Sequence, residues 1–274
     1  MAGSPLVTLN SGQLMPQLGL GVYKVNQDIA VQLVQGALDI GYRRIDTAAL
    51  YDNEAEVGAA IRKSGLAREE IFVTSKIWND RHGYHEAKEA IQESVDRLNI
   101  GYVDMMLIHW PCPKQDKYVE TWHAFEEVLE TGLVRGIGVS NFHQHHLEKL
   151  IASSNIVPAI NQVELHPQLA QDSLRKFDTQ QGIHTEAWAP LGRARFMTHP
   201  LLVEIAEQLG RSVAQVIIRW HLQLGNLVIP KSSNPDRLAE NFAVFDFELS
   251  EQQMGLIAQL NTETRIATNP DDMN

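Results

Sequence analysis

Val103-Asp-Met-Met-Leu-Ile-His109 is an apolar run that ends on a histidine, and the segment 118–131 after it is amphipathic and stops at Gly132. A short apolar run bounded by polar residues is typical of a buried strand. A glycine just beyond the last periodic residue is a common helix stop. This part of the chain therefore predicts a strand followed by a helix, and the same pattern recurs along most of the sequence.

The recurring pattern predicts the architecture. Strands are expected at 18–23, 43–48, 71–77, 103–109, 134–140, 159–165, 184–189 and 227–232. Helical segments follow, for example 28–40 before Gly41, 53–64 before Gly65 and 171–181 before Gly182. Strands that alternate with helices run parallel and are joined by right-handed crossovers. Ahead of them, Val7 to Met15 carries a Ser-Gly turn and predicts a small N-terminal β-hairpin.

Eight strand–helix units favour a closed (β/α)8 TIM barrel over an open, doubly wound sheet. An open sheet that binds a nucleotide usually carries Gly-x-Gly-x-x-Gly after its first strand. Gly19-Leu-Gly21 and Gly136-Ile-Gly138 lack the third glycine, and both lie inside expected strands. The sequence shows no linker or low-complexity tract, so residues 1–274 are expected to form a single α/β domain.

The composition excludes several classes of partner. Of 274 residues, 44% are apolar, and Lys+Arg 23 against Asp+Glu 34 gives a net charge of −11. Nucleic acid and anionic membrane surfaces repel such a chain. The single cysteine, Cys112, excludes an internal disulfide and multi-thiolate metal sites. No apolar stretch is long enough for a bilayer and no signal peptide is visible, so a cytoplasmic protein is expected.

Polar and aromatic residues stand at the carboxyl ends of the expected strands, where a barrel builds its active site. In chain order these are Asp46, Lys76, His109, Ser140 with Asn141, Asn161 with Gln162, Trp188, and Lys231 with Ser232. Tyr51 lies in the turn after Asp46. Because the strands themselves are apolar, a polar group at each end favours one shared site on the rim.

Four of these residues suit acid catalysis that needs neither a thiol nor a metal ion. They are Tyr51, Lys76, Asp46 and His109. A tyrosine phenol titrates near ~10, and a neighbouring ammonium is expected to lower its pKa. Asp46 would keep Lys76 charged, while His109 would donate a hydrogen bond to a substrate oxygen. Such a set protonates a developing alkoxide, as carbonyl reduction requires. The hydride itself must come from a cofactor, since no side chain supplies one.

The last strand leads into a basic segment, Ile229-Pro-Lys-Ser-Ser-Asn-Pro-Asp-Arg237. Hydroxyls and backbone amides at a helix N-terminus bind phosphate without a glycine loop. Lys231 and Arg237 add two positive charges in an acidic chain, which favours an anionic ligand such as a phosphomonoester.

Three ordered segments resemble the signatures of the aldo-keto reductase family. They are Gly41-Tyr-Arg-Arg-Ile-Asp-Thr-Ala-Ala-Leu-Tyr51 continuing to Gly58, Leu133-Val-Arg-Gly-Ile-Gly-Val-Ser-Asn-Phe142, and Ile229-Pro-Lys-Ser followed by Arg237. Within that family the chain is most similar to bacterial 2,5-diketo-D-gluconate reductases. Shared motifs include Trp-Asn-Asp at 78–80, His-Trp-Pro at 109–111 and Asn-Gln-Val-Glu-Leu-His-Pro at 161–167.

The resemblance implies a role for each matching residue. It implies a catalytic tetrad of Asp46, Tyr51, Lys76 and His109, with Tyr51 as proton donor, and it implies NADPH as cofactor. The residues implied to bind the cofactor are Ser140, Asn141, Gln162, Trp188, Leu191, Gly192, Lys231, Ser232, Ser233, Arg237, Glu240 and Asn241. The residues implied to contact a small carbonyl substrate are Tyr23, Trp78, His109 and Trp110. Keto-sugar acids and methylglyoxal are among the substrates expected, and a monomer is expected.

Two positions depart from the family pattern. Arg44 stands where the family usually has a histidine or a small residue, and no chemical role is expected for it. The loop from Leu191 to about Pro200 is short, whereas many eukaryotic relatives have a longer flap over the pyrophosphate. Fast exchange and weak binding of the cofactor are therefore expected.

Two other functions stay open. Lys76 and Lys231 lie at strand ends, where barrel aldolases place a Schiff-base lysine, although Asp46 would keep Lys76 charged. The same barrel could also be a binding protein without catalysis. His143, His145 and His146 suggest a metal site, but no acidic residue is adjacent in sequence, so a solvated helix start is expected there.

Overall fold

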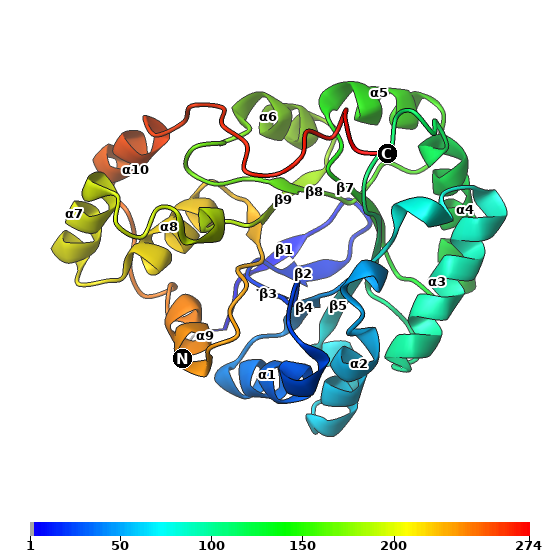
Figure 1. Cartoon of the computed structure of the whole chain (residues 1–274), viewed down its shortest axis with the longest axis horizontal. Helices are drawn as coiled ribbons and strands as arrows, with labels where there is room; N and C mark the ends of the chain where they lie inside the picture. The colour runs from blue at the N-terminus through cyan, green and yellow to red at the C-terminus, as the bar shows by residue number, and fades with distance from the viewer. Residues whose placement is uncertain (1–2) are drawn as a thin grey trace.

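The N-terminal hairpin forms as predicted. The computed structural model describes residues 3–274, and β1 (Leu6–Thr8) pairs antiparallel with β2 (Leu14–Pro16), with Val7 opposite Met15. Met15 is buried in a small cluster with Phe72, Met105 and Leu107, which come from the strands of the main sheet. The hairpin therefore packs against the end of the sheet at which those strands begin (Figure 1).

All eight predicted strands are present and all run parallel. They are β3 (Leu20–Gly21), β4 (Arg44–Asp46), β5 (Phe72–Ile77), β6 (Met105–Ile108), β7 (Ile137–Ser140), β8 (Ile160–Glu164), β9 (His184–Trp188) and β10 (Leu227–Val228). Each pairs with its neighbour in sequence, from β3 to β10. The two edges then meet, because Leu18 bridges Val228 in parallel and the Gly19 N–H donates to the Val228 carbonyl at 2.9 Å. The barrel is closed, and the open-sheet alternative is excluded.

Helices surround the barrel (Figure 1). They are α1 (Gln27–Ile40), α2 (Glu54–Lys63), α3 (Tyr84–Leu98), α4 (Tyr118–Thr131), α5 (Gln144–Ala152), α6 (Asp172–Gln180), α7 (Pro200–Leu209), α8 (Val213–Gln223), α9 (Pro235–Phe242) and α10 (Glu251–Ala258). Most strands are followed by one helix, whereas both α7 and α8 separate β9 from β10. None of the helices in residues 3–274 has the length and apolar character that a membrane span requires.

Glycine ends two helices in the way the sequence predicts. Gly41 caps α1 at a φ of 124°, and Gly132 caps α4 at a φ of 77°. α2 and α6 end earlier than expected, with Ser64 and Gln181 as cap residues just before the expected glycines.

The last strand is shorter than predicted. β10 covers only Leu227–Val228, whereas a strand over 227–232 was expected. Pro230 has no N–H to donate to the ladder, so it limits the strand. Its carbonyl still accepts from the Gly21 N–H at 3.2 Å. Lys231 and Ser232 consequently lie in the loop between β10 and α9 rather than in the sheet.

The apolar core lies between the sheet and the helices. One face of each helix contributes to it, including Val34 of α1, Ile91 of α3 and Trp122 of α4, all fully buried. This layer holds the strands in place, and their carboxyl ends therefore define a fixed rim on which side chains can be positioned.

Candidate active site

Asp46 and Lys76 form an ion pair at the rim. Asp46 is the last residue of β4 and Lys76 lies near the end of β5, the adjacent strand. The Lys76 Nζ lies 2.6 Å from the Asp46 Oδ1 and also donates to the Thr47 carbonyl at 2.8 Å. Both side chains are buried. The two acceptors fix the Lys76 side chain in position.

Tyr51 and His109 complete the group that the sequence predicted. Tyr51 ends a short 3-10 helix, Ala49–Tyr51, after β4, and His109 directly follows β6. The Lys76 Nζ lies 5.1 Å from the centroid of the Tyr51 ring. The rings of Tyr51 and His109 meet edge to face, with centroids 5.8 Å apart. The four residues, distant in sequence, therefore converge at one place.

The charge environment of Tyr51 differs from the expectation. Burial raises the pKa of Tyr51 well above 10, and the carboxylates of Asp46 and Glu186 raise it further. The expected lowering by Lys76 was wrong, because desolvation and negative charge dominate around the phenol. The phenol is consequently neutral and holds its proton at physiological pH.

His109 is also neutral. Burial lowers the pKa of His109 well below 6.5, and the positive charge of Lys76 lowers it further. Its Nδ1 is buried without a hydrogen-bond partner among the described residues. A neutral imidazole carries one N–H and can donate a hydrogen bond without adding charge to the site.

Aromatic rings border this group. The Tyr23 ring lies 5.0 Å from that of Tyr51, and the Trp78 ring lies 5.0 Å from that of His109. Tyr23 is 44% exposed, so it stands at the outer edge of the site. Trp110 follows His109 in the chain and is 8% exposed. Cys112, in the same loop, is buried, and burial raises the pKa of its thiol to about 12.

A hydrogen-bonded wall joins β7, β8 and β9 beside the group. The Asn141 side chain donates to the His109 carbonyl at 3.0 Å and accepts from the Trp188 indole at 2.8 Å. Ser140 donates to the Gln162 carbonyl at 2.8 Å. Asn141 has a φ of 63°, which places its amide back toward Ser140. These four residues, predicted from three strands, therefore lie together.

Gln162 links the ion pair to a second pair that the sequence analysis missed. Its amide nitrogen donates to Asp46 at 2.7 Å and to Glu186 at 2.8 Å. Glu186 is in turn paired with Arg44 at 2.8 Å, and both side chains are fully buried. A Cβ at Gly19 would overlap the Arg44 guanidinium, so glycine is required there. A charged residue inside each of two expected strands, Arg44 and Glu186, was the signal available in the sequence.

The basic segment lies at the start of α9. The Lys231 Nζ donates to the Ser233 Oγ at 3.3 Å, and the Asn234 side chain caps α9 by accepting from the Arg237 N–H. Ser232 accepts from the Asn234 N–H at 3.1 Å. Lys231 and Arg237 are exposed. These positive groups and hydroxyls thus surround one helix N-terminus, as an anion site requires.

Glu240 and Asn241 belong to α9 itself. The Glu240 carboxylate accepts from the Ser212 hydroxyl, at the N-cap of α8, and Asn241 is buried. Their expected place beside an adenine stays a prediction.

The loop after β9 has an unusual backbone. Gly192, Arg193 and Ala194 form a 3-10 turn in which all three residues have positive φ. A Cβ at Gly192 would overlap the Phe196 ring, so the turn depends on glycine. Leu191, which precedes the turn, packs against the core. Rapid cofactor exchange through this short loop stays a prediction, which stopped-flow measurement of NADP+ release would test.

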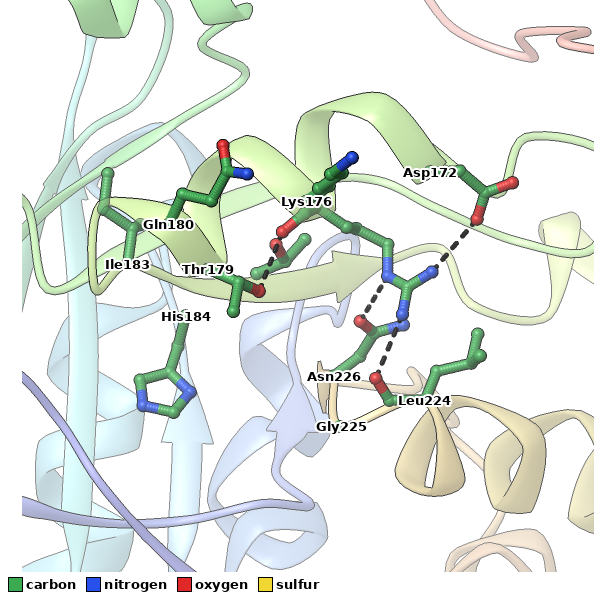
Figure 2. A pocket seen from close by; sticks show the side chains of 11 residues that line it. Asp172, Lys176, Thr179, Gln180, Ile183, His184, Leu224, Gly225 and Asn226 are labelled. Carbon is green, nitrogen blue, oxygen red and sulfur yellow. Dashed lines mark hydrogen bonds and ion pairs between the residues drawn. The ribbon is translucent and has the colours of Figure 1, made fainter.

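A hollow of about 360 Å³ lies far from these residues, at the end of the barrel where β9 begins (Figure 2). Arg175 is a partly buried cation in its wall, and its guanidinium donates to Asn226, Leu224 and Asp172 at 2.9, 3.0 and 3.2 Å. The guanidinium therefore joins α6 to the segment before β10, and this hollow has no part in the candidate active site.

Comparison with known proteins identifies relatives along nearly the whole chain. The sequence profile of the Aldo/keto reductase family matches residues 15–262. An aldo-keto reductase of Mycobacterium sp. is 49% identical over 272 residues, covering 99% of each chain. Glyoxal reductase of Bacillus subtilis is 48% identical, covering 97% of this chain and 96% of its own. Methylglyoxal reductase DkgA of Escherichia coli is 43% identical, covering 99% and 98%.

Solved structures agree with the fold. The protein Gox0644 in its apo form superposes with a TM-score of 0.95 at 44% identity, covering 98% of each chain. A mutant of Gox0644 in complex with NADPH gives 0.96 at 43% identity, covering 100% of each chain. An aldo-keto reductase of Bombyx mori in complex with NADP gives 0.93 at 34% identity, covering 100% of this chain and 98% of its own.

Proposed function

The chain belongs to the aldo/keto reductase family, and we propose that it is an NADPH-dependent reductase of small aldehydes and ketones in which Tyr51 is the proton donor. The observation that carries the assignment is the convergence of Tyr51, Lys76, Asp46 and His109 at the rim. Relatives named glyoxal and methylglyoxal reductases support dicarbonyl substrates. Keto-sugar acids such as 2,5-diketo-D-gluconate are a second substrate class within the proposal.

The residues present fit NADPH on the chemistry of their donors. Amide and hydroxyl groups of Ser140, Asn141 and Gln162 suit a carboxamide, and the Trp188 indole offers a flat apolar face beside them. Leu191 and Gly192 would line the path of the pyrophosphate. Lys231, Ser232, Ser233 and Arg237 suit a 2′-phosphate, with Glu240 and Asn241 near the adenine. When bound, NADPH supplies the hydride that the carbonyl carbon accepts.

Tyr51 supplies the proton that balances that hydride. As negative charge develops on the carbonyl oxygen, the neutral phenol transfers its proton to that oxygen, and the product is an alcohol. The phenolate left on Tyr51 lies beside Lys76, whose ammonium stabilises it until solvent returns a proton. The high pKa of the phenol ensures that Tyr51 enters each turnover protonated.

Asp46 and His109 position these groups. Asp46 holds the Lys76 ammonium and, through Gln162, is tied to β8. The neutral His109 would donate its N–H to the substrate oxygen and align the carbonyl with the phenol. Tyr23, Trp78 and Trp110 would enclose the rest of the substrate, and walls of this kind suit small molecules.

Replacement of one hydroxyl tests the assignment. Tyr51→Phe should retain NADPH binding, measured by fluorescence titration, and lose at least about a hundredfold of aldehyde-dependent NADPH oxidation. Tyr84→Phe, at the start of α3 where the hydroxyl contacts Glu127 of α4, is the matched control and should keep full activity. Near-normal turnover in Tyr51→Phe would refute the role of the phenol.

The two alternative functions have less support. Lys76 is ion-paired at 2.6 Å and charged, so it is a poor Schiff-base nucleophile, and Lys231 is exposed. Borohydride trapping with substrate would detect a lysine adduct on either residue, and none is expected. Aldehyde-dependent oxidation of NADPH by the wild-type chain would exclude a purely binding role.

A further inference from the structure

Three histidines at the start of α5 surround one carboxylate from the C-terminal tail. His143, His145 and His146 were expected to form a solvated helix start, and α5 does begin there. His146, however, is only 2% exposed, and the tail brings Asp271 onto the cluster (Figure 1 shows the tail in red, running past α6 to α5). The sequence could not show this contact, because Asp271 is far away along the chain.

Three distances to Asp271, one to its Oδ2 and two to its Oδ1, are close to those between neighbouring ligands of one metal ion. Oxygens of Asp271 lie 3.2 Å from the His143 Nδ1, 3.2 Å from the His145 Nε2 and 3.3 Å from the His146 Nε2. The four donor atoms all lie within 4.8 Å of one another. In tetrahedral zinc sites the bonds are about 2.05 Å, so neighbouring ligand atoms are about 3.3 Å apart.

One nitrogen of the cluster has no hydrogen-bond partner among the described residues, and an ion can reach the cluster from solvent. The His146 Nε2 is buried, points at the other three donors and makes no hydrogen bond among the described residues. A buried nitrogen without a partner costs free energy unless something binds it. A hollow of about 370 Å³, lined by His143, His145 and Asp271, opens beside the cluster and gives an ion a path to it.

We propose that His143, His145, His146 and Asp271 bind a zinc ion that fastens the C-terminal tail to α5. Three imidazoles and one carboxylate are ligands that Zn²⁺ accepts in tetrahedral geometry.

The charges around the cluster favour a divalent cation. Asp271 is joined by Glu164 and Glu263, whose charges act on Arg265, the one cation of the tail that contacts the cluster. These three carboxylates outnumber the two nearby cations, Arg265 and Lys149, the second of which acts on His146, so the surroundings remain negative and attract Zn²⁺.

Two hydrogen bonds compete with coordination. Arg265 donates to the His143 Nε2 at 2.9 Å, and the His143 N–H donates to the His146 Nδ1 at 3.1 Å. Zinc would bind the other ring nitrogen of each residue, the His143 Nδ1 and the His146 Nε2. The ring proton then moves to the nitrogen that accepts the hydrogen bond, so both bonds are lost. Each competitor is a single hydrogen bond, whereas zinc forms four coordinate bonds in the site. Coordination therefore prevails.

The ion would add a second anchor to the tail. At present the Ile266 and Ala267 N–H groups donate to Glu164, the last residue of β8 and near Gln162. Farther along, the Asn274 side chain accepts from the Lys114 N–H, in the loop after β6 that also carries Trp110. A zinc ion at Asp271 lies between these two contacts and would hold the tail along the rim.

Calorimetric titration of the full chain, without a histidine tag, with ZnCl₂ tests the site. We expect one ion per chain with a Kd of about 1 µM or below. Asp271→Asn and His145→Ala should weaken binding at least about tenfold. Asp272→Asn and His85→Ala, which change a neighbouring carboxylate and an unrelated histidine, should not. Both cluster positions are partly exposed, so the variants should fold.

Two further measurements distinguish a built site from general surface binding. Co²⁺ in place of Zn²⁺ should give the intense visible absorption of a tetrahedral complex, and Zn²⁺ should slow amide exchange in residues 265–274 of the wild type but not of Asp271→Asn. Several weak sites, equal affinity in Asp271→Asn, or an octahedral Co²⁺ spectrum would each overturn the proposal. None of these outcomes depends on reductase activity.

Discussion

Arg44 and Glu186 form an ion pair of 2.8 Å inside the barrel, with both side chains excluded from solvent. Burial raises the pKa of Glu186, and the positive charge of Arg44 opposes that rise. Glu186 also accepts from Gln162, which in turn donates to Asp46. The pair thus belongs to a continuous polar network that reaches Lys76, whose Nζ lies 5.1 Å from the centroid of the Tyr51 ring.

Removal of Arg44 alone should strongly lower the free energy of unfolding. Arg44→Leu leaves Glu186 buried without a counter-ion, and breaking a buried pair in this way costs about 3–5 kcal/mol of unfolding free energy. Arg44→Leu combined with Glu186→Leu should recover most of that loss, since no unpaired charge remains. Urea unfolding measures both, with Lys88→Leu, from an exposed pair with Glu127, as control. A double variant as unstable as the sum of the single variants would contradict this account.

Reduction should be insensitive to pH over a wide range. Tyr51 must be protonated, and its raised pKa keeps it so above pH 9, while the lowered pKa of His109 keeps that ring neutral below pH 6. Single-turnover reduction rates should therefore stay level between about pH 5.5 and about pH 9. A rate that falls with a midpoint near neutral pH would show that one of the two groups titrates there.

Asp178 should make the fold less stable as pH rises. This α6 carboxyl is buried against Thr185, and burial raises its pKa to about 7. The folded chain thus holds a proton that the unfolded chain loses from about pH 4, and stability falls between about pH 4 and about pH 7. Asp178→Asn removes this dependence and should be more stable than wild type by a few kcal/mol at pH 8.

The same comparison near pH 4 should show little difference between Asp178→Asn and wild type. Asp39→Asn, an exposed carboxyl on α1, serves as control in chemical denaturation at both pH values. An equal gain at both pH values would mean that the effect comes from packing rather than from protonation.

Arg237 should discriminate between the two nicotinamide cofactors. If its exposed guanidinium binds the 2′-phosphate, Arg237→Ala loses a charged hydrogen bond of about 1.5–3 kcal/mol, a rise of about 10- to 150-fold in KM for NADPH. KM for NADH, which has no such phosphate, should hardly change. Arg211→Ala, where Arg211 pairs with Asp246, is the control. Equal rises for both cofactors would rule out a phosphate contact.

The barrel and the group around Tyr51 could be predicted because both follow from periodicity. Parallel strands end on a common rim, so Asp46, Lys76 and His109 had to meet once the strands were located. The pairing of Arg44 with Glu186 could not be predicted, because it depends on which side chains cross the barrel interior. The pKa of Tyr51 depends on how fully neighbouring groups exclude water, which sequence spacing does not contain.

The tail illustrates another limit. Residues after α10 have no periodic pattern, so nothing in their sequence indicates that Ile266 would contact Glu164 or that Asp271 would reach His146. Contacts of irregular segments are set by the surface on which they lie. The sequence alone therefore indicates only three of the four residues of the histidine cluster, without Asp271.

The close approach of Arg44 to Gly19 and its ion pair with Glu186 couple three positions on three segments of the barrel. A relative with any side chain at position 19 has no space for arginine at 44, and a relative without that arginine needs another solution for the acid at 186. Replacing a single strand of this barrel with that of such a relative should destabilise the fold unless residues 19, 44 and 186 are all exchanged at once.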